Sequence, residues 1–335
     1  MERTRRILWV MIVALWASFF WLPNMDWAAA KDPDYPTKPI EFYINMAAGG
    51  STDLSCRAFI EAAGKHLEQP MIPINKVGGS GAICAMAVKN AKPDGYTLGN
   101  ITTSSTFVVP FSDDAPYKDL SGFTFLAKYG NNIFPVIVRG DAPWRNWKEF
   151  IDWAKKNPRG TKVGITGAKT ADYKGLVLWQ VEKREQAEFT YLAYKGGSEV
   201  LSAILGGHIN LYASTIDPST LSYIKEGKLR ILTYIGTAKV QGHEDIPSTK
   251  EMYGFEGPSL LAVCGPKGLP PYVLKKLDDA FAKAVKDPNF IKLMERMNMP
   301  IEYINRVELT KYVEDVFNKT AKIYAGVKEE EMKKK

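Results

Sequence analysis

The chain of 335 residues carries 44 Lys and Arg against 37 Asp and Glu, a formal net charge of +7. These charges are dispersed, and the one basic run, Lys328 to Lys335, has the composition of a solvated chain end. A nucleic-acid-binding protein, which gathers its basic residues in one stripe, is therefore excluded, whereas a small anionic ligand suits the mildly basic composition.

The N-terminus has the three parts of a secretory signal peptide. Three arginines within the first six residues precede an uncharged run, Ile7 to Leu22, and the small residues Ala28 to Ala30 follow. A single membrane-spanning helix is the alternative, but this run of 16 residues is shorter than the roughly 20 that a bilayer needs. We expect residues 1–30 to be removed after Ala30, which leaves 41 basic and 35 acidic residues in a soluble exported chain.

The segment Lys38 to Asp53 predicts an anion-binding loop. The apolar run Ile40 to Ile44 has the pattern of a buried strand, and the small residues Ala47 to Gly50 form a turn before a helix that begins near Ser51. Glycines let the backbone approach a ligand, and the unpaired amides and positive dipole at a helix start favour a carboxylate or phosphate. An ordinary strand-to-helix turn is the alternative that this segment by itself leaves open.

Strand and helix patterns alternate over the next part of the chain. Met71 to Asn75 and Tyr96 to Ile101 are predicted strands, a glycine-rich turn and a helix lie between them, and the hydroxyl-rich loop Thr102 to Thr106 follows. This order predicts a largely parallel sheet, whose ligands bind at the carboxyl ends of the strands.

A second set of alternating elements begins after the apolar runs Phe123 to Lys128 and Ile133 to Arg139. Its strand at Lys162 to Ile165 leads into the loop Thr166 to Thr170, and its strand at Phe189 to Ala193 leads into Tyr194 to Ser198. Both loops contain glycine and precede a predicted helix, so the second set repeats the chemistry of the first.

The last part of the chain contains long amphipathic helices, which we expect to pack on the first set of strands. The chain then passes between two lobes twice, and about 305 residues exceed what one core usually contains. We therefore predict an α/β protein of two lobes, joined by a two-strand hinge with a ligand cleft between them. The predicted domains are a signal peptide (1–30), lobe I (36–125 plus 256–335) and lobe II (126–255).

Cysteine and histidine spacing predicts no metal site and no cofactor. The three histidines are scattered, and the three cysteines form no CxxC pair. Cys56 and Cys84 either form a disulfide or pack as small apolar residues in two helices, and we favour packing.

Three motifs in order resemble those of one known family. AGGSTD at Ala48 to Asp53, PDGYTL at Pro93 to Leu98 and YKGG at Tyr194 to Gly197 are similar to the substrate-binding receptors of tripartite tricarboxylate transporters. The resemblance covers nearly the whole chain after residue 35. It implies a type II periplasmic-binding fold and a periplasmic, monomeric receptor that binds a di- or tricarboxylate or related acid and delivers it to membrane permease subunits.

The resemblance also implies which residues contact the ligand. In the first lobe these are Ala48, Gly49, Gly50, Ser51 and Asp53, with the hydroxyls of Thr102 and Ser104. In the second lobe they are Thr166, Gly167, Ala168 and Thr170, and we add Lys169 and Lys195.

Lys169 departs from the family pattern, which has glycine and serine in this loop. If its ammonium points inward, it supplies a counter-charge for a second carboxylate; if it points outward, it does not affect binding. Two other charged residues have similar alternatives. Asp53 either stabilises the helix start or accepts from a ligand group, and Lys195 either binds the ligand or is solvated.

Two alternative functions fit a two-lobed exported protein. A periplasmic enzyme of the same shape needs an activated nucleophile or an acid and base pair, and the sequence has no GxSxG, HExxH or GxxxxGK[ST] motif. A receptor that presents its ligand to a membrane sensor uses the same closed form, so the sequence does not separate it from a transport receptor.

Overall fold

The computed structural model describes residues 33–158, 160–166, 172–255 and 257–333. Tyr35–Lys335 forms one compact unit, and all that follows concerns it. Within the described residues, no helix combines the length and apolarity that crossing a bilayer requires.

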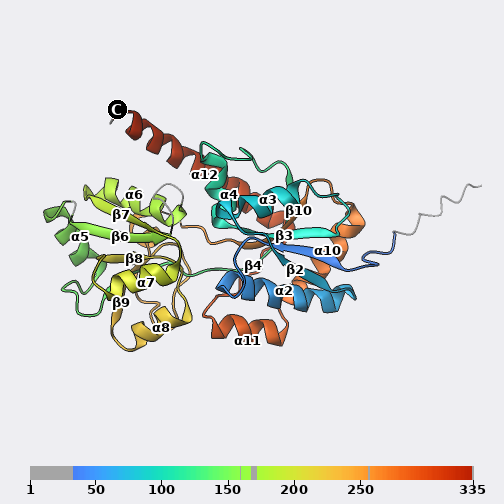
Figure 1. The fold of residues 1–335 in the computed structure, drawn as a ribbon, viewed down its shortest axis with the longest axis horizontal. Coiled ribbons are helices and arrows are strands. Elements are labelled where there is room, and N and C mark those ends of the chain that lie inside the picture. Colours follow the sequence, from blue (N-terminus) through green and yellow to red (C-terminus); the bar gives the residue numbers. More distant parts are fainter. Residues whose placement is uncertain (1–32, 159, 167–171, 256, 334–335) are drawn as a thin grey trace, which may run out of the picture. The chain divides into compact units, whose positions relative to one another are not determined.

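The first sheet has the strand order β2-β1-β3-β10-β4. Its strands are β1 (Ile40–Ile44), β2 (Met71–Asn75), β3 (Thr97–Thr102), β4 (Phe123–Gly130) and β10 (Leu261–Pro266). β1 pairs in parallel with β2 and β3, whereas β10 runs antiparallel to both β3 and β4. The loops after β1, β2 and β3 therefore leave the sheet at one edge (Figure 1).

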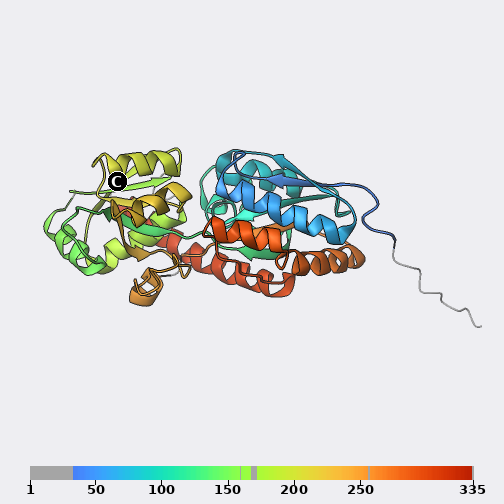
Figure 2. The ribbon, with the colours of Figure 1, turned by 90° about the horizontal axis from the view of Figure 1, so that it is seen from below.

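Helices cover both faces of this sheet. On one face, α2 (Ser51–Leu67), α10 (Pro271–Ala284) and α11 (Pro288–Arg296) lie side by side, as Figure 2 shows. On the other face lie α3 (Ala82–Lys89), α4 (Thr103–Phe107) and α12 (Arg306–Lys333), with two short 3-10 turns, η1 (Gly79–Gly81) and η2 (Val109–Phe111).

The second sheet has the order β7-β6-β8-β5-β9. Its strands are β5 (Pro135–Arg139), β6 (Thr161–Thr166), β7 (Phe189–Tyr194), β8 (Leu211–Ala213) and β9 (Leu229–Tyr234). β6 pairs in parallel with β7 and β8, so the loops after these three strands also share one edge. The helices that follow are α5 (Trp147–Lys156), α6 (Tyr173–Glu185), α7 (Gly197–Leu205), α8 (Pro218–Lys225) and α9 (Thr249–Tyr253).

The chain passes between the two sheets twice, through residues 131–134 and 235–260. The two passages are bonded to each other, because the amide of Asn132 donates to Ser259 Oγ at 2.7 Å. All of β4 belongs to the first sheet, so the predicted lobe boundary at 125/126 falls inside that strand. The division into lobes remains a prediction.

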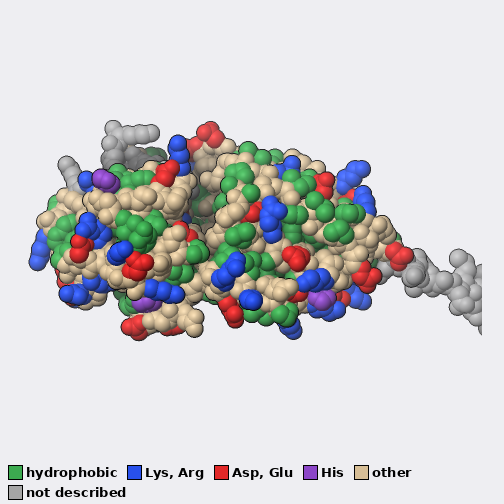
Figure 3. Space-filling view, turned by 60° about the horizontal axis from the view of Figure 1, so that its bottom comes forward, with side chains coloured by type: hydrophobic (Ala, Val, Ile, Leu, Met, Phe, Trp, Pro, Cys, Tyr) green, Lys and Arg blue, Asp and Glu red, His purple; other side chains and the backbone are tan. Residues whose placement is uncertain are grey.

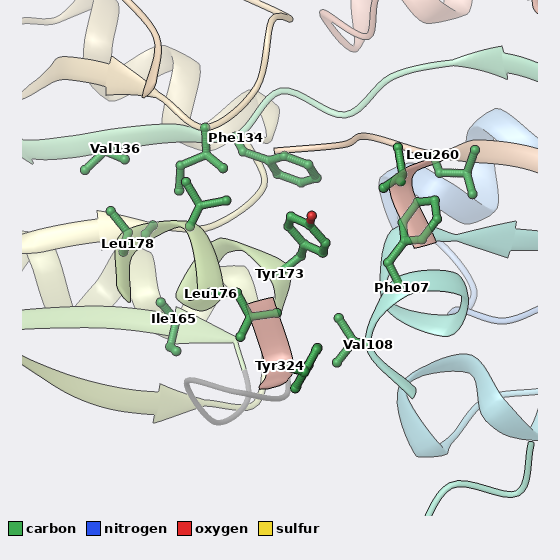
Figure 4. Packing of buried hydrophobic residues seen from close by; sticks show 14 of the residues in the cluster. Phe107, Val108, Phe134, Val136, Ile165, Tyr173, Leu176, Leu178, Leu260 and Tyr324 are labelled. Atoms are coloured by element: carbon green, nitrogen blue, oxygen red, sulfur yellow. The ribbon is translucent and has the colours of Figure 1, made fainter. Parts of the chain in front are cut away.

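One apolar cluster continues from the first sheet to the second. Phe107 of α4 and Tyr173 of α6 make an edge contact with ring centroids 6.3 Å apart, and Tyr324 of α12 lies beside them (Figure 4). The Tyr173 hydroxyl also lies 3.2 Å from Thr320 Oγ1 of α12. The last helix, expected to pack on the first set of strands, thus also contacts α6, which belongs with the second sheet.

The three cysteines are free and buried. Cys56 Sγ lies 3.0 Å from the Tyr129 hydroxyl inside the core under α2. The interpretation that Cys56 and Cys84 pack as small apolar residues is therefore confirmed, and the alternative of a disulfide between them is wrong.

Phe59 is the centre of the core between α2 and the first sheet. It is fully buried, stacks on Tyr129 at 4.5 Å and contacts Phe281 and Phe290. Phe59→Ala should lower the free energy of unfolding by about 3–5 kcal/mol, because it leaves a cavity. Urea denaturation measures this loss.

Ile72→Ala is the matched control, because Ile72 is exposed on edge strand β2. It should change the free energy of unfolding by no more than about 0.5 kcal/mol. Equal losses in the two variants would contradict this assignment of the core.

Candidate functional site

A buried polar network joins the ends of β1 and β3. The Asn45 amide donates to Asn100 Oδ1 at 2.7 Å, Asn45 Nδ2 donates to Thr102 Oγ1 at 3.0 Å, and Asn100 Nδ2 donates to Asn45 Oδ1 at 2.9 Å. Because buried polar groups are costly unless they are hydrogen-bonded, this network determines where the loop after β1 begins. Neither asparagine was predicted from the sequence, although Asn100 interrupts a predicted buried strand and could have indicated a polar contact there.

The glycine turn before α3 packs on the same network. A Cβ atom at Gly81 would lie 2.7 Å from Asn45 Nδ2 and 3.0 Å from Ser105 Cβ, and the φ angle of Gly81 is +93°. Only glycine fits this approach without displacing Asn45. The loops after β1, β2 and β3 are thus held against one another.

Asp53 is bonded inside the protein and is only 2% exposed. Its carboxylate accepts from the Gly49 amide at 2.9 Å, from Arg57 Nε and from Asn75 Nδ2 at 2.8 Å. Burial by itself raises the pKa of Asp53, but these hydrogen bonds outweigh burial, so the pKa lies below its ordinary value. The carboxylate therefore holds the loop in place, and the Gly49 amide is already occupied.

The start of α2 retains unpaired amides. Its N-cap residue, Gly50, is extended and supplies no side-chain cap, and the first intrahelical bond runs from Leu54 N to Gly50 O. Within the described ranges, no acceptor is recorded for the amides of Ser51 and Thr52. The space above them is open: a Cβ at Gly49 would meet no atom within 4 Å, and one at Gly50 only Ala47 O at 3.5 Å. Ala48 is exposed in the same loop.

The two predicted hydroxyls at the end of β3 have different surroundings. Thr102 is buried, accepts from Asn45 and forms a capping box with Ser105 at the start of α4. Ser104 is half-buried on the first turn of α4. Thr102 therefore positions the loop, and Ser104 is the more accessible of the two.

The first predicted loop of the second sheet is described only at its ends. Gly167, Ala168, Lys169 and Thr170 lie outside the described residues. Thr166, the last residue of β6, donates from Oγ1 to Asp172 Oδ2 at 2.9 Å. Asp172 caps α6, since its Oδ1 accepts from the Lys174 amide at 2.9 Å.

The loop after β7 leads to a second open helix start. Gly196 is the extended N-cap of α7 and makes no side-chain cap bond, and a Cβ at Gly196 would meet nothing within 4 Å. Lys195 is exposed, and its backbone amide donates to Glu199 Oε2 at 3.0 Å. A Cβ at Gly197 would lie 3.4 Å from Oγ of Ser214, which follows β8 and is buried. The sequence analysis did not single out Ser214.

The structure thus gathers the predicted residues at two sheet edges. Ala48 to Asp53, Thr102 and Ser104 share the edge of the first sheet, and Thr166 and Lys195 share that of the second, where Thr166 pairs with Tyr194. The Phe107–Tyr173 contact brings the helix that follows β3 against the helix that follows β6. In the space-filling view, charges of both signs are interspersed on the visible face (Figure 3).

A polar cavity of about 170 Å³ lies beside the two passages between the sheets. Asn132 lines it, and its buried Oδ1 has no hydrogen-bond partner in the part of the chain that the structure describes. Lys128, buried and paired with Glu302 at 2.8 Å, forms another wall. None of the predicted site residues lines this cavity. In residues 33–333, apart from the undescribed gaps, no group of His, Cys, Asp or Glu could hold a metal ion.

The family model of the tripartite tricarboxylate transporter family receptor matches residues 56–328. The chain belongs to this family. A relative from Cupriavidus necator, the UPF0065 protein in the gbd 5' region, is 32% identical over 296 residues, which are 87% of this chain and 88% of the relative.

Solved structures agree with the family. A TctC solute-binding protein from Polaromonas is 28% identical and has a TM-score of 0.73, covering 88% of this chain and 99% of that one. MatC from Rhodopseudomonas palustris, with bound malate, has a TM-score of 0.72 at 19% identity, covering 87% and 100%. Another R. palustris protein, with adipate, has a TM-score of 0.72 at 22% identity, covering 87% and 98%. The predicted periplasmic-binding fold of this solute-binding receptor family is confirmed.

The Asp53 network predicts a pH-dependent stability difference. Because the pKa of Asp53 is lower in the folded than in the unfolded protein, its contribution is complete above the unfolded pKa of about 4 and is lost as the pH falls through the folded pKa. Asp53→Asn should therefore be less stable than the wild type by about 1–3 kcal/mol at pH 7, with a smaller difference near pH 3. Urea denaturation at both pH values measures this.

Asp114→Asn, at an exposed position, is the control and should leave the stability at both pH values nearly unchanged. A difference between Asp53→Asn and the wild type that stays constant from pH 7 to pH 3 would contradict the proposed ionised network.

Proposed function

We propose that this receptor binds a small organic carboxylate between its two sheet edges and closes on it. The observation that carries the proposal is the open start of α2, where the amides of Ser51 and Thr52 are unpaired beneath an exposed loop. Unpaired amides at the positive end of a helix of 17 residues favour an anion. The open start of α7 supplies a comparable group of amides at the second edge.

The predicted contact residues take different roles in this proposal. Ser51 and Gly50 border the ligand directly, whereas Gly49, Asp53 and Thr102 maintain the loop through internal bonds. Ala48, Ser104 and Lys195 are accessible beside the two helix starts. Thr166 ends β6, and the following residues 167–170 remain expected contacts that lie outside the described ranges.

The malate and adipate bound by two proteins of the same fold support the choice of an acid. We further propose that residues 1–30 direct export to the periplasm and are removed, and that the closed receptor delivers its ligand to the membrane permease of a tripartite transporter. No catalytic role is proposed, because binding and delivery require no reacting side chain.

A panel of small carboxylic acids tests the proposal by thermal unfolding. At a ligand concentration 100 times its Kd, a bound acid should stabilise the protein by about 2.7 kcal/mol, because it binds only the folded state. Mass spectrometry of the denatured, freshly purified protein identifies any acid that copurifies. No stabilisation by any acid, together with no released acid, would contradict carboxylate binding.

Gly50→Val tests the site itself. Gly50 has φ −73° and ψ 162°, which valine adopts without strain, and its Cβ would meet only Ala47 O at 3.5 Å. The variant should fold normally but bind the acid at least about tenfold more weakly, since the side chain covers the α2 amides. Isothermal titration calorimetry gives the affinity.

Ala91→Val, at a half-buried position after α3, is a control that adds a similar side chain away from both sheet edges. It should retain wild-type affinity. Undiminished affinity in a folded Gly50→Val variant would show that the start of α2 is not the binding site.

A further inference from the structure

A lysine is buried where the two sheets meet. Lys174, the second residue of α6, is 8% exposed. Its Nζ lies 2.8 Å from Asp172 Oδ2 and 5.0 Å from the centroid of the Phe134 ring. Phe134 belongs to the first passage between the sheets, so the ammonium lies beside that passage.

The start of α6 also contacts the first lobe. Tyr173, the neighbour of Lys174, contacts Phe107 of α4 and Thr320 of α12. Figure 4 shows Phe134 and Tyr173 directed toward Leu260 and Phe107, which come from the end of the second passage and from α4. Lys174 therefore lies beside the contact between α6 and the helices α4 and α12.

Asp172 cannot satisfy the whole ammonium group. Its Oδ1 accepts from the Lys174 amide, and its Oδ2 accepts from Thr166 Oγ1 and forms an ion pair with Nζ. An ammonium has three hydrogens to donate, and within the described residues the carboxylate paired with Nζ is that of Asp172. The remaining donors are available to a further acceptor.

Stability alone does not account for this charged pair. Its two side chains are 10% and 6% exposed, and a buried ion pair is often no more stabilising than apolar residues of similar volume. A buried cation at a ligand boundary has a direct use, because a carboxylate bound there gains a charge-assisted hydrogen bond in a site of low water content.

We propose that Lys174 selects ligands with a second carboxylate, which it binds through its free donors while the α2 amides bind the first. This inference rests on the proposed function and refines it to dicarboxylates. Asp172 orients Lys174 and neutralises its charge in the empty receptor.

Paired acids that differ by one carboxylate test the proposal. Calorimetry compares malate with 3-hydroxybutyrate and adipate with hexanoate, for the wild type and for Lys174→Met. The wild type should prefer the dicarboxylate of at least one pair. Lys174→Met should weaken that dicarboxylate at least about tenfold and change its monocarboxylate partner less than about threefold.

Two further variants separate this effect from folding and from net charge. Asp172→Asn combined with Lys174→Met removes both charges, so that no buried carboxylate is left unpaired, and it should show the same loss of preference. Lys162→Met removes an exposed lysine from the opposite end of β6 and should leave all four affinities unchanged.

The outcomes distinguish the two proposals. A wild type that binds acids but prefers no dicarboxylate, or Lys174 variants that keep the wild-type preference, would overturn the role of Lys174 alone. A wild type that binds none of the acids in the wider carboxylate panel would overturn the proposed function as well.

Discussion

Parallel pairing at the centre of each sheet is the constraint on which the rest of this structure depends. Since parallel strands all point the same way, β1, β2 and β3 deliver their following loops to one edge, and β6, β7 and β8 do the same in the second sheet. Helix starts then accumulate at those edges with their amides directed outward. Two such edges that approach each other supply the unpaired amides with which a receptor can bind a small anion.

Two carboxylates of the protein itself fix the loops at these edges in the absence of a ligand. Asp53 accepts from the Gly49 amide, and Asp172 accepts from the Lys174 amide and caps α6. Each of these two carboxylates occupies a backbone amide that is then not available to a ligand, but each also holds its loop in one conformation. A preorganised loop loses less conformational entropy on binding, so fewer unpaired amides suffice for a given affinity.

The two sheets are also joined by apolar packing beside the passages of the chain. Phe107, Tyr173 and Tyr324 come from α4, α6 and α12, and they form part of one continuous cluster. Because α12 contacts both sides through Thr320 and its neighbours, any closing movement must repack this cluster or pivot about it. The proposed closure on a ligand is therefore coupled to an apolar contact as well as to the two connecting segments.

The sequence by itself predicted the α/β class, the order of strands and helices, the glycine loops at strand ends and the family. These follow from local periodicity, turn residues and ordered motifs, which act over a few residues along the chain. It also predicted a helix start at Gly50 and Ser51 that would bind an anion, because a glycine turn followed by a helix is recognisable without knowledge of its surroundings.

Only the tertiary structure decided how the charged and polar residues are used. Asp53 is an internal partner of Gly49 and Arg57, Asn45 meets Asn100 across 55 positions, and Lys174 is buried against Phe134. These roles depend on contacts between segments that are distant in the sequence. The residues next to a charged side chain in the sequence do not show whether that side chain is solvated or buried. In the loop after β1, which is predicted to bind an anion, burial and hydrogen-bond partners decided which backbone amides are free.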